Sequence, residues 1–382
     1  MPGRPFSAPH LAPAAASASV TSSGIWGLVV AGIAAWIGRP TPPDDLAPPA
    51  GGAFAPPDRR GGDIVRQAAT HALLILFCVS AVGVASATDL GLITAGESGT
   101  YYQFGHDLRR LAKRGGIELR VHPSRGSVDN ISAVSQGGDV KLGIVQADVL
   151  YFIAALSSDP AIARIASNLR MVFPLFNEEV HVIGRPDIRD FDELAGKRIA
   201  IGYEGSGTNL TARLLFQLAG IVPAEALPVD LGEGLAQLKA GRIDAVVYVA
   251  GYPVRVLSDQ LTSADGLALI PITNKSVFEV YGETQIPPNI YNWQKMPVRT
   301  ATVKAVLVAF ASRGPECETI GRLARQIVTG MDWLTRRGHP RWRLVELDAP
   351  LKGWEQYDCV RKHLAGVPGA VSLPPPSEGR RR

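Results

Sequence analysis

The sequence predicts a two-lobed α/β fold, and the main evidence is an internal repeat. Residues 90–100 (LGLITAGESGT) and 198–208 (RIAIGYEGSGT) each form a short apolar run that ends in a Ser-Gly-Thr turn. Each turn precedes a segment with helical periodicity, and each half then has a Gly and an Asp before a second apolar strand, VKLGIVQ or AVVYVA. The two turns lie 108 residues apart, from Ser98 to Ser206. We therefore expect two similar α/β lobes that face one cleft.

Alternating strands and helices are expected in the first lobe, which we place at residues 88–178. The helix after the first turn is predicted by apolar residues spaced four and three apart, at Phe104, Leu108 and Leu111. A second helix is predicted at 126–136 by the same criterion. The predicted strands are 90–95, 117–122 and 142–146, and a long extended stretch follows at 169–184. This stretch is long enough to leave one lobe and enter the other.

The second lobe is placed at residues 179–272, with a return to the first lobe at 273–366. Its predicted elements are a short polar helix near Asp190, strands at 198–202 and 244–250, and helices at 209–218 and 231–240. Further helices are predicted at 298–312 and 319–335, and residues 367–382 form a Pro- and Arg-rich tail that we expect to be disordered. Because the chain crosses between lobes twice, the hinge should consist of two extended segments.

The N-terminal region divides into two parts. Residues 1–64 are rich in Pro and Ala and are not expected to form a packed core. In residues 65–87, Arg66 precedes an apolar run that ends in Ala-Ser-Ala, the pattern of a secretory signal peptide. Since such a signal belongs at the N-terminus, we expect translation to start near Val65 and the exported, periplasmic chain to begin near Thr88. The alternative is a genuine long extension with an uncleaved membrane anchor.

Composition and motifs argue against several functional classes. The 39 basic and 35 acidic residues are nearly balanced, and no basic stripe with interleaved aromatic residues suits a nucleic acid. The metalloprotease, serine-hydrolase and CxxC motifs do not occur, and the five His residues beyond the signal peptide lack the spacing of metal ligands. We therefore expect a protein that is not an enzyme and that binds no metal or cofactor.

The two Ser-Gly-Thr turns are the strongest candidates for a binding site. Each opens a helix, whose first N–H groups are unpaired within the helix and favour a negative charge. The alternative is that these hydroxyls serve as helix N-caps. The candidate residues are Ser98, Gly99, Thr100, Ser206, Gly207 and Thr208.

Two cysteines remain if the signal peptide is removed. Cys78 leaves with the signal, whereas Cys317 and Cys359 stay in the exported chain. An even pair in an oxidising compartment is a candidate disulfide. The alternative is a pair of buried free thiols.

Three motifs in order carry a resemblance to a known family. GESGTYYQFGHDLRRL, HPSRGSVDNISAVSQGGDVKLGIVQADVLY and GYEGSGTNLTARLL resemble the motifs of the TAXI-type extracytoplasmic solute receptors of TRAP transporters, over roughly residues 90–300. The resemblance implies a type II periplasmic-binding-protein fold. It also implies capture of a small organic anion, such as glutamate or a related carboxylate, for delivery to a TRAP-type membrane permease.

The resemblance also implies which residues face the ligand. The first motif adds Tyr102, with Tyr101 as a secondary candidate, to the first turn, and core packing is the alternative for both rings. The second motif adds Ser127, Asn130 and Gln146. Small hydroxyls and amides at helix starts bind carboxylate oxygens without a buried fixed charge.

Two charged residues depart from the family pattern. Glu97 stands where the family has a small or apolar residue, and it would favour an ammonium group on the ligand. Arg125 could offset it by pairing with a ligand carboxylate, or could simply be a solvated surface residue. Tyr291 and Trp293 are candidates for a lid over the site.

Two other functions stay open on the sequence. One is a sensory protein that presents the bound solute to a receptor kinase. The other is an enzyme on the same two-lobed scaffold, for which Glu97 is the candidate acid or base.

Overall fold

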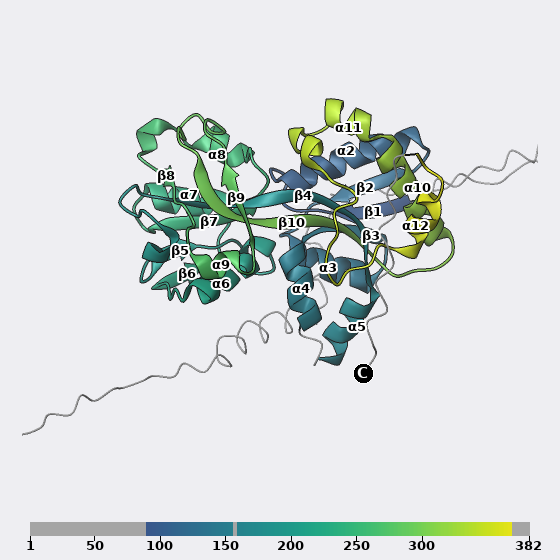
Figure 1. Cartoon of the computed structure of the whole chain (residues 1–382), viewed down its shortest axis with the longest axis horizontal. Coiled ribbons are helices and arrows are strands. Elements are labelled where there is room, and N and C mark those ends of the chain that lie inside the picture. Colours follow the sequence, from purple (N-terminus) through teal and green to yellow (C-terminus); the bar gives the residue numbers. More distant parts are fainter. Residues whose placement is uncertain (1–88, 156–158, 369–382) are drawn as a thin grey trace, which may run out of the picture. The chain divides into compact units, whose positions relative to one another are not determined.

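The computed structural model describes residues 89–155 and 159–368, whose helices and strands are labelled in Figure 1. The predicted segments 1–64 and 65–87, together with Cys78, lie outside these residues. So does most of the predicted tail at 367–382. None of the helices in the described residues combines the length and apolar character that a bilayer span needs.

Lobe 1 is built on three parallel strands in the order β2-β1-β3. The helix after the first turn buries Phe104, Leu108 and Leu111, as its periodicity predicts. This helix packs against the apolar strands to form the core of lobe 1. The strands are β1 (Asp89–Ile93), β2 (Glu118–His122) and β3 (Val140–Gln146), and the helices are α2 (Thr100–Arg114), α3 (Ser127–Gln136), α4 (Ala147–Ala155) and α5 (Pro160–Asn168).

Lobe 2 repeats this arrangement, with parallel strands in the order β6-β5-β7. The helix after the second turn ends at Gly220, which adopts the left-handed conformation expected of a glycine C-cap. The elements are η1 (Phe191–Leu194), β5 (Arg198–Ala200), α6 (Gly207–Ala219), β6 (Glu225–Leu227), α7 (Leu231–Lys239), β7 (Ala245–Ala250), α8 (Arg255–Gln260), η2 (Ser263–Asp265), β8 (Ala268–Leu269), α9 (Lys275–Phe278) and β9 (Gly282–Ile286).

Two long antiparallel strands connect the lobes, β4 (Leu169–Gly184) and β10 (Val298–Phe310), which lie side by side in Figure 1. The first part of β4 and the last part of β10 continue the sheet of lobe 1, where β10 pairs with β3. At the other end, β4 pairs with β7 and β10 pairs with β9. The predicted two-lobed, type II periplasmic-binding-protein fold with a two-segment hinge is thus confirmed.

The second segment that crosses between the lobes differs from the prediction in two respects. Residues 298–310 form the strand β10, whereas the sequence analysis predicted a helix at 298–312. The helix prediction was wrong: six of the 13 residues are Val or Thr, whose branched side chains favour strands. The return to lobe 1 also comes later than residue 273, since Ile286, Tyr291 and Trp293 belong to the core of lobe 2.

The C-terminal helices cover lobe 1. The predicted helix at 319–335 is divided at Gly330, where an added Cβ would lie 2.6 Å from Cδ1 of Leu111. Glycine therefore permits a close approach to α2. The elements are α10 (Pro315–Thr329), α11 (Met331–Arg337), η3 (Pro340–Leu344) and α12 (Asp358–Leu364).

The structure joins Cys317 of α10 to Cys359 of α12 by a disulfide, with the Cα atoms 5.4 Å apart. Of the two sequence interpretations, the disulfide is the one found. The bond closes a loop across a sequence separation of 42 residues and ties the last helix to lobe 1.

Replacing both Cys317 and Cys359 by Ser should lower the free energy of unfolding by about 2–4 kcal/mol, because the unfolded chain regains the entropy that the loop removes. Urea denaturation measures the loss. Reductant should destabilise the wild-type protein by a similar amount and leave the double variant unchanged. If the oxidised wild-type protein and the double variant were equally stable, the disulfide would have no role in stability.

Candidate functional site

A cavity of about 500 Å³ lies between the two lobes. Its volume is within the range of roughly 300–1,000 Å³ that is usual for small-molecule sites. The starts of α2 and α3 and the end of β3 line it from lobe 1, Glu178 lines it from the crossing strand β4, and the β5–α6 turn, the start of α7 and β7 line it from lobe 2. The repeated turns therefore meet across one cavity, as the sequence predicted.

Most of the sequence-predicted site residues line this cavity. They come from all three motifs and from both lobes. The predicted residues that line the cavity are Ser98, Gly99, Thr100, Arg125, Ser127, Gln146, Ser206, Gly207 and Thr208, and the secondary candidate Tyr101 joins them.

Three predicted residues do not line the cavity. Glu97 is exposed to solvent, and Tyr102 packs edge-to-face on His106 with the ring centres 4.5 Å apart. Asn130 is fully buried, and its amide nitrogen donates to the backbone carbonyls of Thr94 and Ile144. These bonds hold the ends of β1 and β3 together. Asn130 thus supports the site from behind.

The hydroxyls of the second turn are already engaged within lobe 2. Ser206 Oγ accepts from the backbone N–H of Asn209 at 3.1 Å and is the N-cap of α6. Thr208 Oγ1 accepts from the backbone N–H of Val249 at 3.1 Å. The N-cap interpretation therefore holds for Ser206. In the first turn Gly99 is the N-cap residue of α2 and supplies no side-chain cap.

The lobes touch each other beside the cavity. The backbone N–H groups of Val128 and Asp129, at the start of α3, both donate to the carbonyl of Gly205 in lobe 2, at 3.1 and 3.3 Å. Thr100 Oγ1 donates to the carbonyl of Gly251 at 3.3 Å. These bonds cross from lobe 1 to lobe 2, so the structure is a closed form.

A second bridge between the lobes is centred on Asp148, a buried residue of α4. Its carboxylate accepts from Thr211 Oγ1 at 2.6 Å and from Tyr281 Oη at 2.8 Å. Both donors belong to lobe 2. Burial raises the pKa of Asp148, which these hydrogen bonds partly oppose.

The wall of the cavity formed by β4 carries a buried carboxyl group, Glu178. Tyr101 Oη donates to its Oε2 at 2.5 Å. Burial raises the pKa of Glu178 to about 8, because the charged form loses its hydration. At neutral pH the protonated form of this side chain therefore predominates in the absence of a ligand.

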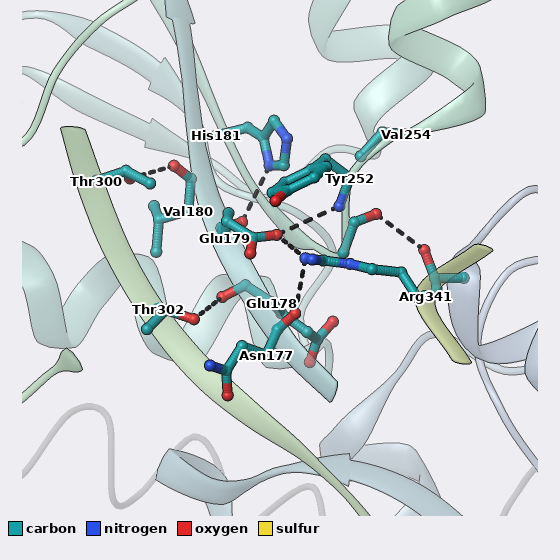
Figure 2. Close-up of polar contacts among 12 residues, drawn as sticks. Asn177, Glu178, Glu179, Val180, His181, Tyr252, Val254, Thr300, Thr302 and Arg341 are labelled. Carbon is teal, nitrogen blue, oxygen red and sulfur yellow. Dashed lines mark hydrogen bonds and ion pairs between the residues drawn. The ribbon is translucent and has the colours of Figure 1, made fainter. Parts of the chain in front are cut away.

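The neighbouring acid, Glu179, is paired instead. Figure 2 shows Arg341 reaching from η3 to the Glu179 carboxylate and to the carbonyl of Asn177. The backbone N–H of Tyr252 also donates to Glu179, and the Tyr252 ring lies 4.1 Å from the guanidinium carbon of Arg341. Both charged side chains of the pair are only 3% exposed, so each depends on the other for its charge to be tolerated.

Gln146 is a second cavity residue with a buried acceptor. The residue is 2% exposed and lines the cavity, and its Oε1 has no hydrogen-bond partner among the described residues. Its backbone N–H donates to Ser127 Oγ at 3.0 Å, which fixes the start of the side chain. A buried acceptor without a donor is costly, so this oxygen is suited to a donor group supplied by a ligand.

Sequence reasoning missed Glu178, Tyr248 and Arg341. Tyr248 lines the cavity from β7, and burial raises the pKa of its hydroxyl to about 12. A usable signal was the Glu-Glu pair in the middle of the otherwise apolar stretch at 169–184. Two acids in such a run indicate buried charges with specific partners.

Tyr291 and Trp293 do not form the predicted lid. Both are buried in the core of lobe 2. Tyr291 Oη accepts from the backbone N–H of Val254 and bonds His181 Nε2 at 2.9 Å. Within the part of the chain that the structure describes, no group of three or more His, Cys, Asp and Glu residues is placed to hold a metal ion.

Comparison with known proteins gives a family and several distant structural neighbours. The model of the NMT1-like family matches residues 92–319. The periplasmic binding protein BugD is 10% identical with a TM-score of 0.46, over 68% of this chain and 88% of its own. Tv2483 bound to L-arginine is 12% identical with a TM-score of 0.45, over 69% and 95%. An ancestral arginine-binding protein bound to arginine is 12% identical with a TM-score of 0.42, over 65% and 97%.

The Glu178→Gln variant should become progressively more stable than the wild-type protein as the pH rises from 5 to 8. In the folded wild type the pKa of Glu178 is about 8, against 4.5 for an ordinary Glu. The folded state therefore binds more protons in this range and loses stability with rising pH, whereas Gln has no such dependence. Melting temperatures of the ligand-free proteins measure the difference. The exposed Glu118→Gln is the control, and a pH-independent difference for Glu178→Gln would contradict the raised pKa.

The Gly207→Ala variant should hold the lobes apart. An added Cβ would lie 1.7 Å from Gln146 Oε1 and 2.7 Å from Ser127 Oγ, both in lobe 1, so the methyl group obstructs the closed form. Small-angle X-ray scattering should report a larger radius of gyration than for the wild type. Gly96→Ala is the control, because its Cβ would meet no atom within 4 Å. Identical scattering profiles would show that Gly207 is not needed for closure.

Proposed function

The chain belongs to the NMT1-like family, and from its cavity we propose that it is a solute-binding protein that closes around one small organic anion, a carboxylate or an amino acid. The observation that carries the proposal is the cavity of about 500 Å³ with walls from both lobes. Hydrogen bonds from α3 to Gly205 hold the lobes together beside it. Hinge bending between two such lobes allows a solute to enter and leave. Capture and release need no covalent step, so we assign the protein a binding role and no enzymatic one.

Arg125 and the start of α2 are the proposed anion-binding groups. Arg125 lines the cavity and forms a bidentate pair with Asp129 at 2.9 and 3.0 Å, which orients its guanidinium. The first turn of α2 lies at the cavity. Its N-cap residue is Gly99, which has no side chain that could cap the first N–H groups of the helix. A helix N-terminus and a guanidinium both favour a carboxylate.

We also propose that the protein is exported to the periplasm and delivers its ligand to a TRAP-type permease. The three motifs that resemble those of TAXI-type receptors support this assignment. The Cys317–Cys359 disulfide agrees with an oxidising compartment. A gene for a large multi-span permease beside the gene for this protein would support delivery, whereas a neighbouring receptor-kinase gene would favour sensing.

Ligand binding is tested by thermal shift and calorimetry with a panel of amino acids and carboxylates that includes L-glutamate, glutarate, L-alanine and propionate. A ligand present at 100 times its dissociation constant stabilises the folded protein by about 2.7 kcal/mol. For the compound that binds, Arg125→Gln should weaken binding by about 1.5–3 kcal/mol, the usual value of a hydrogen bond to a charged group.

The control is Arg185→Gln, which removes an exposed arginine that does not line the cavity. It should leave the affinity unchanged. If no compound in the panel stabilises the protein, the proposed function is wrong. If Arg125→Gln binds as tightly as the wild type, the anion subsite is wrongly placed.

A further inference from the structure

The cavity has one wall whose chemistry does not suit an anion. Glu178 lies there on the crossing strand β4, and Tyr101 Oη donates to its Oε2 at 2.5 Å. Gln146 lies at the end of β3 with Oε1 buried and without a partner among the described residues. Both residues line the cavity and carry buried acceptor oxygens. An anion placed against them would be repelled by the ionised form of Glu178, whereas a cation would stabilise that form.

The other ionisable groups around Glu178 do not supply a counter-charge. Tyr101 of α2 and Tyr248 of β7 are neutral hydroxyls, and Asp148 of α4 and Glu179 of β4 repel a negative charge on Glu178. Arg341 of η3 is attractive, but its guanidinium is bound by Glu179. No ion pair in the described part of the chain involves Glu178. Its charged form therefore needs a cation from outside the protein.

Two other charged residues line the cavity, and both have partners. Arg125 pairs with Asp129. Asp230 accepts from Tyr203 Oη at 2.6 Å and from the backbone N–H of Glu233 at 2.7 Å as the N-cap of α7. Asp230 therefore already has two donors from the protein, whereas Glu178 has Tyr101 as its one donor in the described part of the chain.

We propose that Glu178 and Gln146 form a subsite for a cationic amino group of the ligand, and that Glu178 releases a proton to solvent when this group binds. The inference rests on the proposed solute-binding function and narrows its ligand to a compound with both an ammonium group and a carboxylate. An ammonium group carries several N–H donors, enough to serve the Glu178 carboxylate and Gln146 Oε1 together.

The proton balance follows from the state of Glu178 before binding. Burial raises its pKa to about 8, so the carboxyl group is protonated at pH 7. The ligand arrives with its ammonium proton in place, the carboxyl proton passes to water, and an ion pair forms. Because one proton is released, affinity should rise about tenfold for each unit by which the pH increases, up to about pH 8.

The experiment is isothermal titration calorimetry with two matched pairs, L-glutamate with glutarate and L-alanine with propionate. Within a pair the compounds share their carbon skeleton and carboxylates and differ in the amino group. For at least one pair, we expect the amino acid to bind at least tenfold more tightly than its partner. Titration at pH 7 in two buffers with different ionisation enthalpies should report close to one proton released, and affinity should rise about tenfold from pH 6 to pH 7.

The variant Glu178→Gln keeps an oxygen that can accept from Tyr101 but cannot ionise. It should bind the same amino acid at least tenfold more weakly, without proton release and without the pH dependence. The control is Glu118→Gln on the exposed face of β2, which should behave as the wild type. The wild-type proton release and pH dependence test the proposal even if Glu178→Gln folds poorly.

The outcomes separate this proposal from the one on which it rests. Equal binding within both pairs, with no proton release, would overturn the amino-group subsite and leave the solute-binding function intact. Failure of every compound in the wider panel to bind contradicts the solute-binding function itself, and the subsite with it.

Discussion

The structure depends on how two adjacent acids are accommodated on a strand that is buried on both sides. Successive residues of a strand point to opposite faces. Glu179 therefore faces Arg341 (Figure 2), and Glu178 lines the cavity on the other side. The ion pair tolerates burial because each charge is compensated by the other. Arg341 comes from η3, far along the chain, so the C-terminal segment that covers lobe 1 also supplies the cation on which the crossing of the lobes depends.

The architecture was largely predictable because the chain repeats itself. The repeated strand and Ser-Gly-Thr turn indicated two equivalent lobes, and the three parallel strands of each lobe have the corresponding order within one continuous sheet. The second crossing strand was not predictable in the same way. Residues 298–310 form an apolar run whose neighbours β3, β4 and β9 come from distant parts of the sequence. Its Val and Thr residues favour a strand, but a short apolar run is also compatible with a buried helix, and the pairing with these partners decides.

The sequence indicated the residues that line the cavity where they lie at helix starts and missed those whose position depends on buried charge. The turns containing Ser98 and Ser206 were found because small hydroxyls and glycines mark them in the sequence. Asn130 was misplaced because the same buried amide can serve a ligand or the backbone, and here it holds two carbonyls of lobe 1. Glu178 was overlooked because the sequence does not show at which residue β4 leaves lobe 1. That residue decides which side chains of the strand line the cavity.

The carbonyl of Gly205 has a consequence for how the molecule opens. It occupies the N–H groups at the start of α3 that an anion would otherwise use. The closed lobes thus imitate a bound anion with a backbone oxygen. A compound that hydrogen-bonds these amides must first displace Gly205, and it would then sit as a wedge between the lobes. Such a compound would hold the molecule open, so tight binding at that end of the cavity would prevent closure around a solute.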